Sequence, residues 1–122
     1  MTEEKTPLKW KFENETIVTS PAVSDGVVYF GSHDDHLYAV DIKTGKEKWK
    51  FESGDSIYYT PVVSDGVVYF GSKDKHLYAL DTKTGEERWK FETGSYVNST
   101  PAVIDGTVIL AVRGVSVSFN IQ

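Results

Sequence analysis

Three near-copies of one unit of about 40 residues run through this chain. A proline recurs at the same place in each copy, at Pro21, Pro61 and Pro101. The tetrapeptide Trp-Lys-Phe-Glu also occurs three times, at 10–13, 49–52 and 89–92. Residues 21–50 and 61–90 align without a gap and are identical at 23 of 30 positions. A constant period near 40 residues is typical of a repeat array in which each unit needs its neighbours to bury a core.

Each copy is predicted to contain four antiparallel strands. In the first copy they fall at 20–24, 27–31, 37–41 and 47–52. Asp25-Gly26 lies between two apolar runs and predicts a two-residue hairpin turn, since glycine accepts a positive φ angle. The second and third strands are apolar at consecutive positions, so both faces of each sheet must be covered. Stacked four-stranded blades of a β-propeller provide this cover, whereas a one-faced β-solenoid, the alternative, usually has shorter repeats.

The predicted fold class is therefore all-β, a partial β-propeller of about three blades. With strands named A to D along each blade, the chain order is D-ABCD-ABCD-ABC. The expected segments are a flexible tail at 1–7, a lone strand D at 8–13, a blade at 14–52, a second blade at 53–92 and a blade of strands A to C at 93–122. Closed propellers typically have 4–8 blades, so we expect a homodimer in which two chains complete one six-bladed ring.

Composition narrows the possible functions. The formal net charge is −5 and the acidic and basic residues are interspersed in every repeat, which excludes the clustered basic face of a nucleic-acid-binding protein. The chain has no cysteine, so it has neither disulfides nor thiolate chemistry. No apolar run approaches the ~20 residues of a membrane span, and residues 1–5 are polar. We expect a cytoplasmic protein as the sequence is written, or an extracytoplasmic one if a leader was removed, with no membrane partner.

The repeated unit resembles the PQQ-type propeller repeat from about Leu8 to the end of the chain. The matching motifs in the first copy are Ser-Pro-Ala-Val-Ser-Asp-Gly, Val-Val-Tyr-Phe-Gly-Ser, Leu-Tyr-Ala-Val-Asp and Thr-Gly followed by Trp49. The resemblance implies that the tryptophans dock between adjacent blades, here Trp10, Trp49 and Trp89. It also implies that Asp41 and Asp81 help to hold the geometry of each blade.

The same resemblance bears on catalysis. Quinoprotein dehydrogenases with these repeats hold their quinone in an eight-bladed ring, with calcium ligands, a catalytic aspartate and often a vicinal disulfide. This chain has no cysteine and no residues outside the repeats to form such a site, so we expect no cofactor and no enzymatic activity. Other proteins with these repeats bind no quinone, among them an outer-membrane assembly lipoprotein and sensor modules of kinases.

The third copy departs from the first two. The Gly-Ser pair that ends the second strand is replaced by Ala-Val, and the segment that follows alternates strictly between apolar and polar residues. Aligned without a gap, Ser118 and Asn120 fall where the first copy has Tyr38 and Val40. One face of this strand is therefore predicted to be polar.

Two features favour self-association. An isolated stack of three blades is expected to expose two blade faces rich in Val, Tyr, Ile and Leu, and to leave one strand edge open. Both would be covered if residues 8–13 of one chain paired with residues 115–121 of another. The expected seam consists of Leu8, Trp10, Phe12, Val117, Phe119 and Ile121.

The densest polar cluster is His33-Asp34-Asp35-His36, whose side chains can bind metal ions. The same turn reads Lys-Asp-Lys-His in the second copy and Arg-Gly-Val-Ser in the third, so the set does not repeat. Aspartate also favours turns by hydrogen bonding its own backbone, and metal ligands must converge in space. We therefore expect a turn here and no metal site.

A second cluster could bind a ligand. In propellers the B–C turns and the links from strand D to the next blade usually lie on one face. This would gather five side chains of two links near a channel mouth: Asp55, Tyr58, Tyr59, Tyr96 and Asn98. Aromatic rings with amides and acids can bind a sugar, a peptide or a small polar ligand. The alternative is that the tyrosines only wedge neighbouring blades apart.

No phosphate-binding loop and no Ser-His-acid set has a recognisable spacing. We therefore expect a non-enzymatic scaffold that assembles with copies of itself and offers a polar face to a protein or peptide partner. The alternative function is that of a fragment of a ligand- or quinone-binding propeller of the PQQ-type family.

Overall fold

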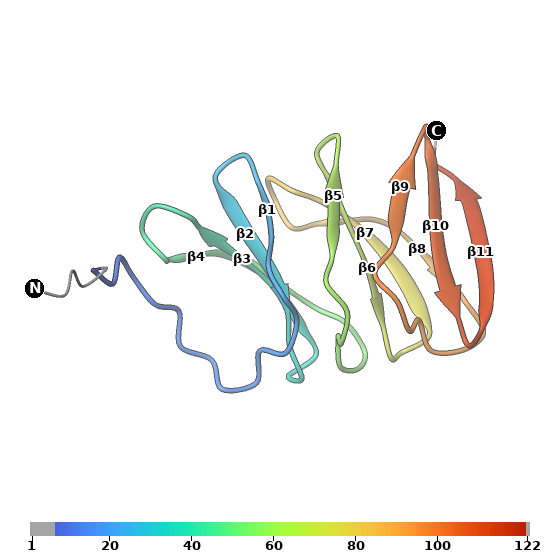
Figure 1. The fold of residues 1–122 in the computed structure, drawn as a ribbon, viewed down its shortest axis with the longest axis horizontal. Helices are drawn as coiled ribbons and strands as arrows, with labels where there is room; N and C mark the ends of the chain where they lie inside the picture. The colour runs from blue at the N-terminus through green and yellow to red at the C-terminus, as the bar shows by residue number, and fades with distance from the viewer. Residues whose placement is uncertain (1–6, 122) are drawn as a thin grey trace, which may run out of the picture.

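Three antiparallel sheets stand side by side in chain order (Figure 1). The structure is a computed structural model, and it describes residues 7–121. Blade 1 has the strands β1 (Ala22–Ser24), β2 (Val27–Gly31), β3 (His36–Asp41) and β4 (Glu47–Glu52). Blade 2 has β5 (Val62–Ser64), β6 (Val67–Ser72), β7 (His76–Asp81) and β8 (Glu87–Glu92). Blade 3 has β9 (Ala102–Ile104), β10 (Thr107–Val112) and β11 (Val115–Asn120).

The predicted all-β fold, with about three antiparallel blades, is confirmed. The strand predicted at 8–13 is wrong, because these residues form no strand in the structure. A strand needs a neighbouring edge for its backbone hydrogen bonds, and no sheet of the described chain pairs with this segment. The tail predicted at 1–7 lies outside the described residues except for Pro7. Residues 7–121 contain no helix long and apolar enough to cross a lipid bilayer.

The core lies between the blades rather than within one sheet. Every residue of β2 and of β6 is buried, as the consecutive apolar pattern predicts. One apolar cluster joins blade 1 to blade 2, and a second joins blade 2 to blade 3. The first contains Tyr29, Leu37, Ile57, Phe70 and Leu80, and the second contains Tyr69, Leu77, Val97, Val108 and Leu110.

A tryptophan of each complete blade approaches the next blade, and Trp49 shows the geometry. Its indole Nε1 donates a hydrogen bond of 2.9 Å to the carbonyl oxygen of Thr82, in the turn between β7 and β8. The ring lies over Gly85 so closely that a Cβ at this residue would be 2.5 Å from the indole Cδ2. Gly85 has a φ of +76°, so the turn requires glycine for its backbone as well as for the space.

The end of β2 is also shaped by the next link. A Cβ at Gly31 would lie 2.3 Å from the Cγ2 of Ile57, which belongs to the segment between blades 1 and 2. Gly71 stands in the same relation to Val97 of the following segment. Glycine at the end of the second strand therefore admits the apolar residue that locks one blade to the next.

Blade 3 is paired in a different register from blades 1 and 2. In blade 2, Phe70 pairs with Tyr78 across a three-residue turn, whereas in blade 3 Leu110 pairs with Val117 across a two-residue turn. The two residues of that turn, Arg113 and Gly114, both have positive φ angles, of 50° and 81°. This is the signature of a type I′ hairpin.

One residue fewer in the turn moves every side chain of the next strand to the other face. Val117 and Phe119 consequently face blade 2 and join its apolar cluster, while Ser118 is exposed. The alignment that puts Ser118 and Asn120 in the places of Tyr38 and Val40 is therefore wrong. One face of β11 is polar, as predicted, but it is the face turned away from blade 2.

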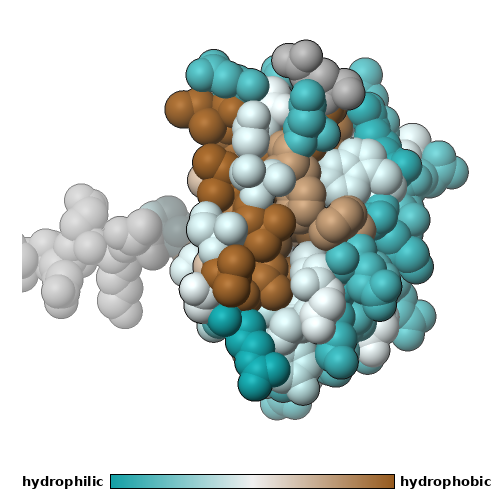
Figure 2. Space-filling model, turned by 90° about the vertical axis from the view of Figure 1, so that its right-hand side faces the viewer, coloured by the Kyte–Doolittle hydropathy of each residue, from teal (hydrophilic) through white to brown (hydrophobic). Residues whose placement is uncertain are grey.

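The two outer faces differ from the apolar surfaces that the sequence predicts. The outer side of blade 1 is covered by the apolar side chains of Trp10, Phe12, Ile17 and Ile42. The outer side of blade 3 carries Ser116 and Ser118, and Figure 2 shows its brown patches separated by pale ones. The expected exposure of two blade faces rich in Val, Tyr, Ile and Leu is wrong, because the N-terminal segment covers one face and the shifted register makes the other partly polar.

Replacing Gly85 by alanine should destabilise the protein more than replacing Gly66. Both glycines have a φ of +76°, so each variant has the same backbone cost of about 1–2 kcal/mol. A Cβ at Gly66 meets no atom within 4 Å, whereas at Gly85 it collides with Trp49. We expect an additional loss of about 1–3 kcal/mol for Gly85→Ala, measured by urea denaturation. Equal losses would contradict the docking of Trp49.

The register of β11 can be tested with two adjacent residues. Phe119→Ala should lower the free energy of unfolding by about 3 kcal/mol, because this ring packs between blades 2 and 3. Ser118→Ala should change it by less than about 0.5 kcal/mol, because this side chain is exposed. A larger loss for Ser118→Ala than for Phe119→Ala would support the register without the shift.

Candidate functional site

The turns between the second and third strands meet the links between blades on one side of the molecule, which we call the turn face. The turn after β2 accepts two backbone hydrogen bonds from the first link, Ser53 to Asp35 at 2.8 Å and Ile57 to Ser32 at 3.1 Å. The turn after β6 accepts the corresponding bond from the second link, Thr93 to Lys75 at 2.8 Å, and it also donates the Lys73 N–H to the Ser56 carbonyl of the first link at 3.0 Å. The predicted gathering of turns and links is thus present in the structure.

Serine side chains tie the links to the turns. The hydroxyl of Ser72 donates to the carbonyl of Asp55 at 3.1 Å and lies 3.1 Å from the hydroxyl of Ser53. Ser32 makes the corresponding contact with the carbonyl of Thr16 at 2.9 Å. Both Ser32 and Ser72 are fully buried, so these bonds satisfy groups that water cannot reach.

An aspartate–tyrosine pair strengthens each of the first two turns. The Tyr38 hydroxyl donates to the Asp34 carboxylate, which also accepts from the side chain of Asn14 at 3.3 Å. In blade 2 the Tyr78 hydroxyl donates to Asp74, which also accepts the Gly54 N–H at 2.8 Å. The pair therefore joins the third strand, the turn and the preceding link.

The pKa values of these groups follow from their contacts. Burial opposes ionisation of Asp34, but the hydrogen bonds from Tyr38 and then Asn14 outweigh it and lower the pKa of Asp34 to about 2. Burial first and the bond to Asp34 second raise the pKa of Tyr38 to about 12. Burial and Asp74 raise the pKa of Tyr78 in the same order. Asp34 is therefore a firmly ionised carboxylate and a poor proton donor.

Of the sequence His33-Asp34-Asp35-His36, Asp34 and His36 approach each other, with the His36 Nδ1 3.4 Å from the Asp34 Oδ1, but the four side chains do not converge on one point. His36 donates its backbone N–H to Asp34 at 3.1 Å, and the ring Nδ1 of His36 lies 2.9 Å from the Asp34 carbonyl oxygen. Asp35 has a positive φ of 75° and presents its carbonyl to the next link. His33 turns outward against Tyr58. Within residues 7–121 no group of three or more His, Asp or Glu side chains could hold a metal ion.

Of the five predicted ligand-binding residues, the structure brings Tyr58 and Tyr96 together. The Lys73 Nζ lies 5.1 Å from the ring centroid of Tyr58 and 5.4 Å from that of Tyr96. On its other side Tyr58 meets the ring of His33 edge-on, with centroids 4.7 Å apart. We call these four side chains the aromatic–cation row.

The other predicted residues lie apart from this row. Tyr59 is 40% exposed, and no ring or cation contact joins it to the row among the residues described. The Asp55 carboxylate accepts the neighbouring Ser56 N–H at 2.7 Å, and Asn98 donates its backbone N–H to Ala111 at 3.3 Å. Lys73 and His33 were missed as partners of the tyrosines. The signal was present, because the residue after the Gly-Ser or Ala-Val pair is His, Lys or Arg in every copy: His33, Lys73 and Arg113.

Asp41 and Asp81 lie at the opposite ends of the blades, in the turns before β4 and β8. The Asp41 carboxylate accepts the backbone N–H groups of Lys43 at 2.8 Å and Thr44 at 3.0 Å, which lower its pKa in that order. The pKa of Asp81 is lowered first by its 3.0 Å bond with Arg88 and then by the same backbone contacts. Asp41 therefore stabilises the turn that Trp10 contacts, and Asp81 stabilises the turn that Trp49 contacts.

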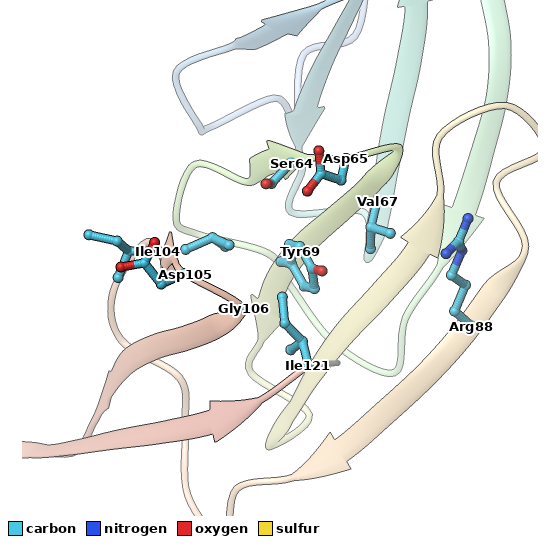
Figure 3. A pocket seen from close by; sticks show the side chains of 10 residues that line it. Ser64, Asp65, Val67, Tyr69, Arg88, Ile104, Asp105, Gly106 and Ile121 are labelled. Carbon is cyan, nitrogen blue, oxygen red and sulfur yellow. The ribbon is translucent and has the colours of Figure 1, made fainter.

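A pocket of about 520 Å³, which the sequence patterns do not predict, lies between blades 2 and 3. Figure 3 shows that its lining comes from the strands β5, β6, β8 and β9, from the turns β5–β6 and β9–β10, and from Ile121 after β11. Its polar side chains are Ser64, Asp65, Tyr69, Arg88 and Asp105. Arg88 is already paired with Asp81, and burial raises the pKa of Tyr69. The pocket lies at the other end of the blades from the turn face.

Comparison with known families identifies the fold. A family model described as outer membrane protein assembly factor BamB matches residues 4–122. The chain belongs to the PQQ-type β-propeller repeat family. No curated protein sequence matches it significantly.

Similar solved structures include three dehydrogenases. One is a quinohemoprotein alcohol dehydrogenase from Comamonas testosteroni, with a TM-score of 0.82, 25% identity and 95% of this chain covered. Another, from Pseudomonas putida HK5, has a TM-score of 0.77, 25% identity and 86% of this chain covered. A europium-containing methanol dehydrogenase, at 22% identity, a TM-score of 0.81 and 94% coverage of this chain, shows the same fold. This chain spans 21%, 19% and 25% of the three proteins, respectively.

The aspartate–tyrosine pair should give stability a defined pH dependence. Asp34 takes up a proton near pH 3.8 when unfolded but only near 2 when folded, so this contribution is lost as the pH falls through that window. The pKa of Tyr38 is 10.0 in the unfolded chain and about 12 in the folded one, so its contribution to stability is lost as the pH rises from 10 to 12. Tyr38→Phe should weaken both dependences, measured as urea midpoints across pH. Tyr59→Phe is the control, and superimposable profiles of the two variants would contradict the assignment.

Proposed function

We propose that this chain is a non-catalytic propeller scaffold whose ring is completed by a second copy of itself. The observation that carries the proposal is the position of residues 8–13. They pack on blade 1 as a fourth strand of a preceding blade would, yet their backbone belongs to no sheet. A segment that is docked by its side chains but not paired through its backbone can still form strand hydrogen bonds with an open sheet edge.

The side chains of this segment repeat the contacts of β4. Trp10 donates its indole N–H to the Ile42 carbonyl at 2.7 Å, as Trp49 does to Thr82. A Cβ at Gly45 would lie 2.6 Å from the Trp10 ring, which matches the position of Gly85 under Trp49. The Phe12 ring lies 5.4 Å from Tyr38, close to the 5.3 Å between Phe51 and Tyr78. Residues 10–13 therefore occupy the site of a fourth strand.

The complementary edge belongs to β11. This strand pairs with β10 on one side, and no strand of the described chain pairs with its other side. An open apolar pocket of about 520 Å³ lies there, lined by Trp89, Phe91, Phe119 and Ile121. Phe91 is 45% exposed, although its counterpart Phe51 is half-buried against blade 2. A fourth strand beside β11 would cover both the edge and the pocket.

Residues 8–13 of a second copy fit this edge by sequence and by register. Their Trp-Lys-Phe-Glu sequence is identical to that of β4, the fourth strand of blade 1. Exchange in both directions would give a symmetric dimer with six blades, within the usual 4–8 of closed rings. Figure 1 places the two segments at opposite ends of the blade stack, so one chain cannot join its own.

The non-catalytic part of the proposal rests on what the polar side chains do. Asp34, Asp74, Ser32 and Ser72 bind the links and turns of their own blades. The pKa of Asp34 is lowered, away from the range that suits a general acid or base near neutral pH. These groups stabilise the turn face rather than provide reactive groups on it.

A second candidate is a segment of a quinone-binding propeller. It is favoured by the likeness to the Comamonas testosteroni dehydrogenase, with a TM-score of 0.82 over about a fifth of that chain. Titration calorimetry with pyrroloquinoline quinone and calcium separates the two candidates. One saturable site per assembled ring would support this second function, and the first predicts none.

Light scattering tests the assembly. We expect a mass near 27 kDa, twice the 13.7 kDa of one chain, at micromolar concentration. Trp10→Ala should shift the protein towards the monomer, while Lys9→Ala, a change of a neighbouring exposed side chain, should leave the dimer intact. A well-folded monomer of the unmodified chain would overturn the proposal.

A disulfide tests the pairing directly. Tyr78 pairs with Lys90 in blade 2, and Val117 and Lys11 hold the corresponding positions at the proposed seam. Because the chain has no cysteine, Lys11→Cys combined with Val117→Cys should give a covalent dimer on oxidation. Lys11→Cys combined with Ile104→Cys is the control. Equal cross-linking of both pairs would contradict the register.

A further inference from the structure

The aromatic–cation row joins four segments of the chain. His33 lies in the turn after β2, Tyr58 in the link to blade 2, Lys73 in the turn after β6 and Tyr96 in the link to blade 3. His33 meets Tyr58 at 4.7 Å between centroids, and Lys73 lies over both Tyr58 and Tyr96. The row therefore crosses the turn face from blade 1 towards blade 3.

The backbone beneath the row is held in place. His33 donates its N–H to the Thr16 carbonyl at 2.8 Å, and Lys73 donates its own to Ser56 at 3.0 Å. Next to Lys73, the Asp74 carboxylate is bound by Tyr78 and by the Gly54 N–H. The side chains themselves remain open to solvent, with Tyr58 38% and Tyr96 52% exposed. A ligand would therefore meet a surface that is already formed.

Lys73 carries a charge with no acidic partner. Within residues 7–121 no carboxylate lies within 4.0 Å of its ammonium group. The nearest acids in sequence are engaged elsewhere, since Asp74 accepts from Tyr78 and Asp55 accepts from Ser56. Two ring faces orient the ammonium group but do not neutralise it.

We propose that the aromatic–cation row is a binding site for an acidic peptide segment. A carboxylate of the peptide binds Lys73, and the apolar atoms beside it pack on Tyr58 and Tyr96. A peptide fits better than a small anion because the row spans two blade boundaries. The basic position also recurs in each copy, at His33, Lys73 and Arg113, so an extended chain that crosses the blades meets one basic residue in each.

The site does not depend on the proposed dimer, because all four side chains belong to one chain and none of them belongs to residues 8–13 or to β11. A failure of assembly would leave this binding unchanged. A failure of binding would likewise leave assembly unchanged.

Titration calorimetry with the peptide acetyl-Glu-Tyr-Glu-Glu-Tyr-Glu-amide tests the site on the full chain at low salt. We expect saturable binding that Lys73→Gln weakens at least tenfold and that Lys73→Arg largely restores. Tyr58→Ala should also weaken it. Lys43→Gln, which removes an exposed lysine at the other end of the blade, should change the affinity less than twofold.

Three outcomes would overturn the proposal. The first is the absence of saturable heat at millimolar peptide, with circular dichroism showing a folded protein. The second is an equal effect of Lys73→Gln and Lys43→Gln, which would mean a diffuse charge effect. The third is equally tight binding of tri-galacturonate, which would show that the row recognises carboxylates without a peptide backbone.

Discussion

The docking of a tryptophan on a glycine of the next blade is the interaction on which the rest of the structure depends. Trp49 bonds to Thr82 and covers Gly85, so the fourth strand of one sheet is fixed to the last turn of the following sheet. The sheets of blades 1 and 2 are apolar on both faces and cannot bury themselves alone. The indole contact sets the orientation in which the two faces meet, and Trp10 repeats it although no strand forms around it.

Stacking in this orientation also builds the turn face. Ile57 enters the space that Gly31 leaves open, and the link that carries it delivers Tyr58 to the surface beside His33. The aspartate–tyrosine pairs then hold each turn against its link, at the cost of making Asp34 unsuitable for proton transfer. The rigidity of this face and the placement of its exposed side chains arise from the same contacts, which is why we propose recognition rather than catalysis.

Much of the fold follows from local patterns, and the prediction for β11 shows their limit. The sequence predicts the Asp-Gly turns, the buried strands and the 40-residue repeat, because each depends on backbone preference or burial over a few residues. The register of β11 depends on a turn shortened by one residue, which an alignment without gaps cannot reveal. Tyr58 and Tyr96 were predicted to be neighbours because both belong to links between blades. Lys73, which contacts both rings, was not predicted, because it belongs to a turn and reaches them only in the folded chain.

The amino-acid sequence by itself determined that this chain forms stacked antiparallel sheets with the core between them, because a strand that is apolar at every position needs cover on both sides. The tertiary structure alone decided the conformation of two segments, residues 8–13 and the strand β11. It left residues 8–13 docked but unpaired, because strand hydrogen bonds require an edge that this chain does not bring to them. It turned Val117 and Phe119 inward and Ser118 outward, because side chains alternate along a strand and one residue in a turn reverses them all.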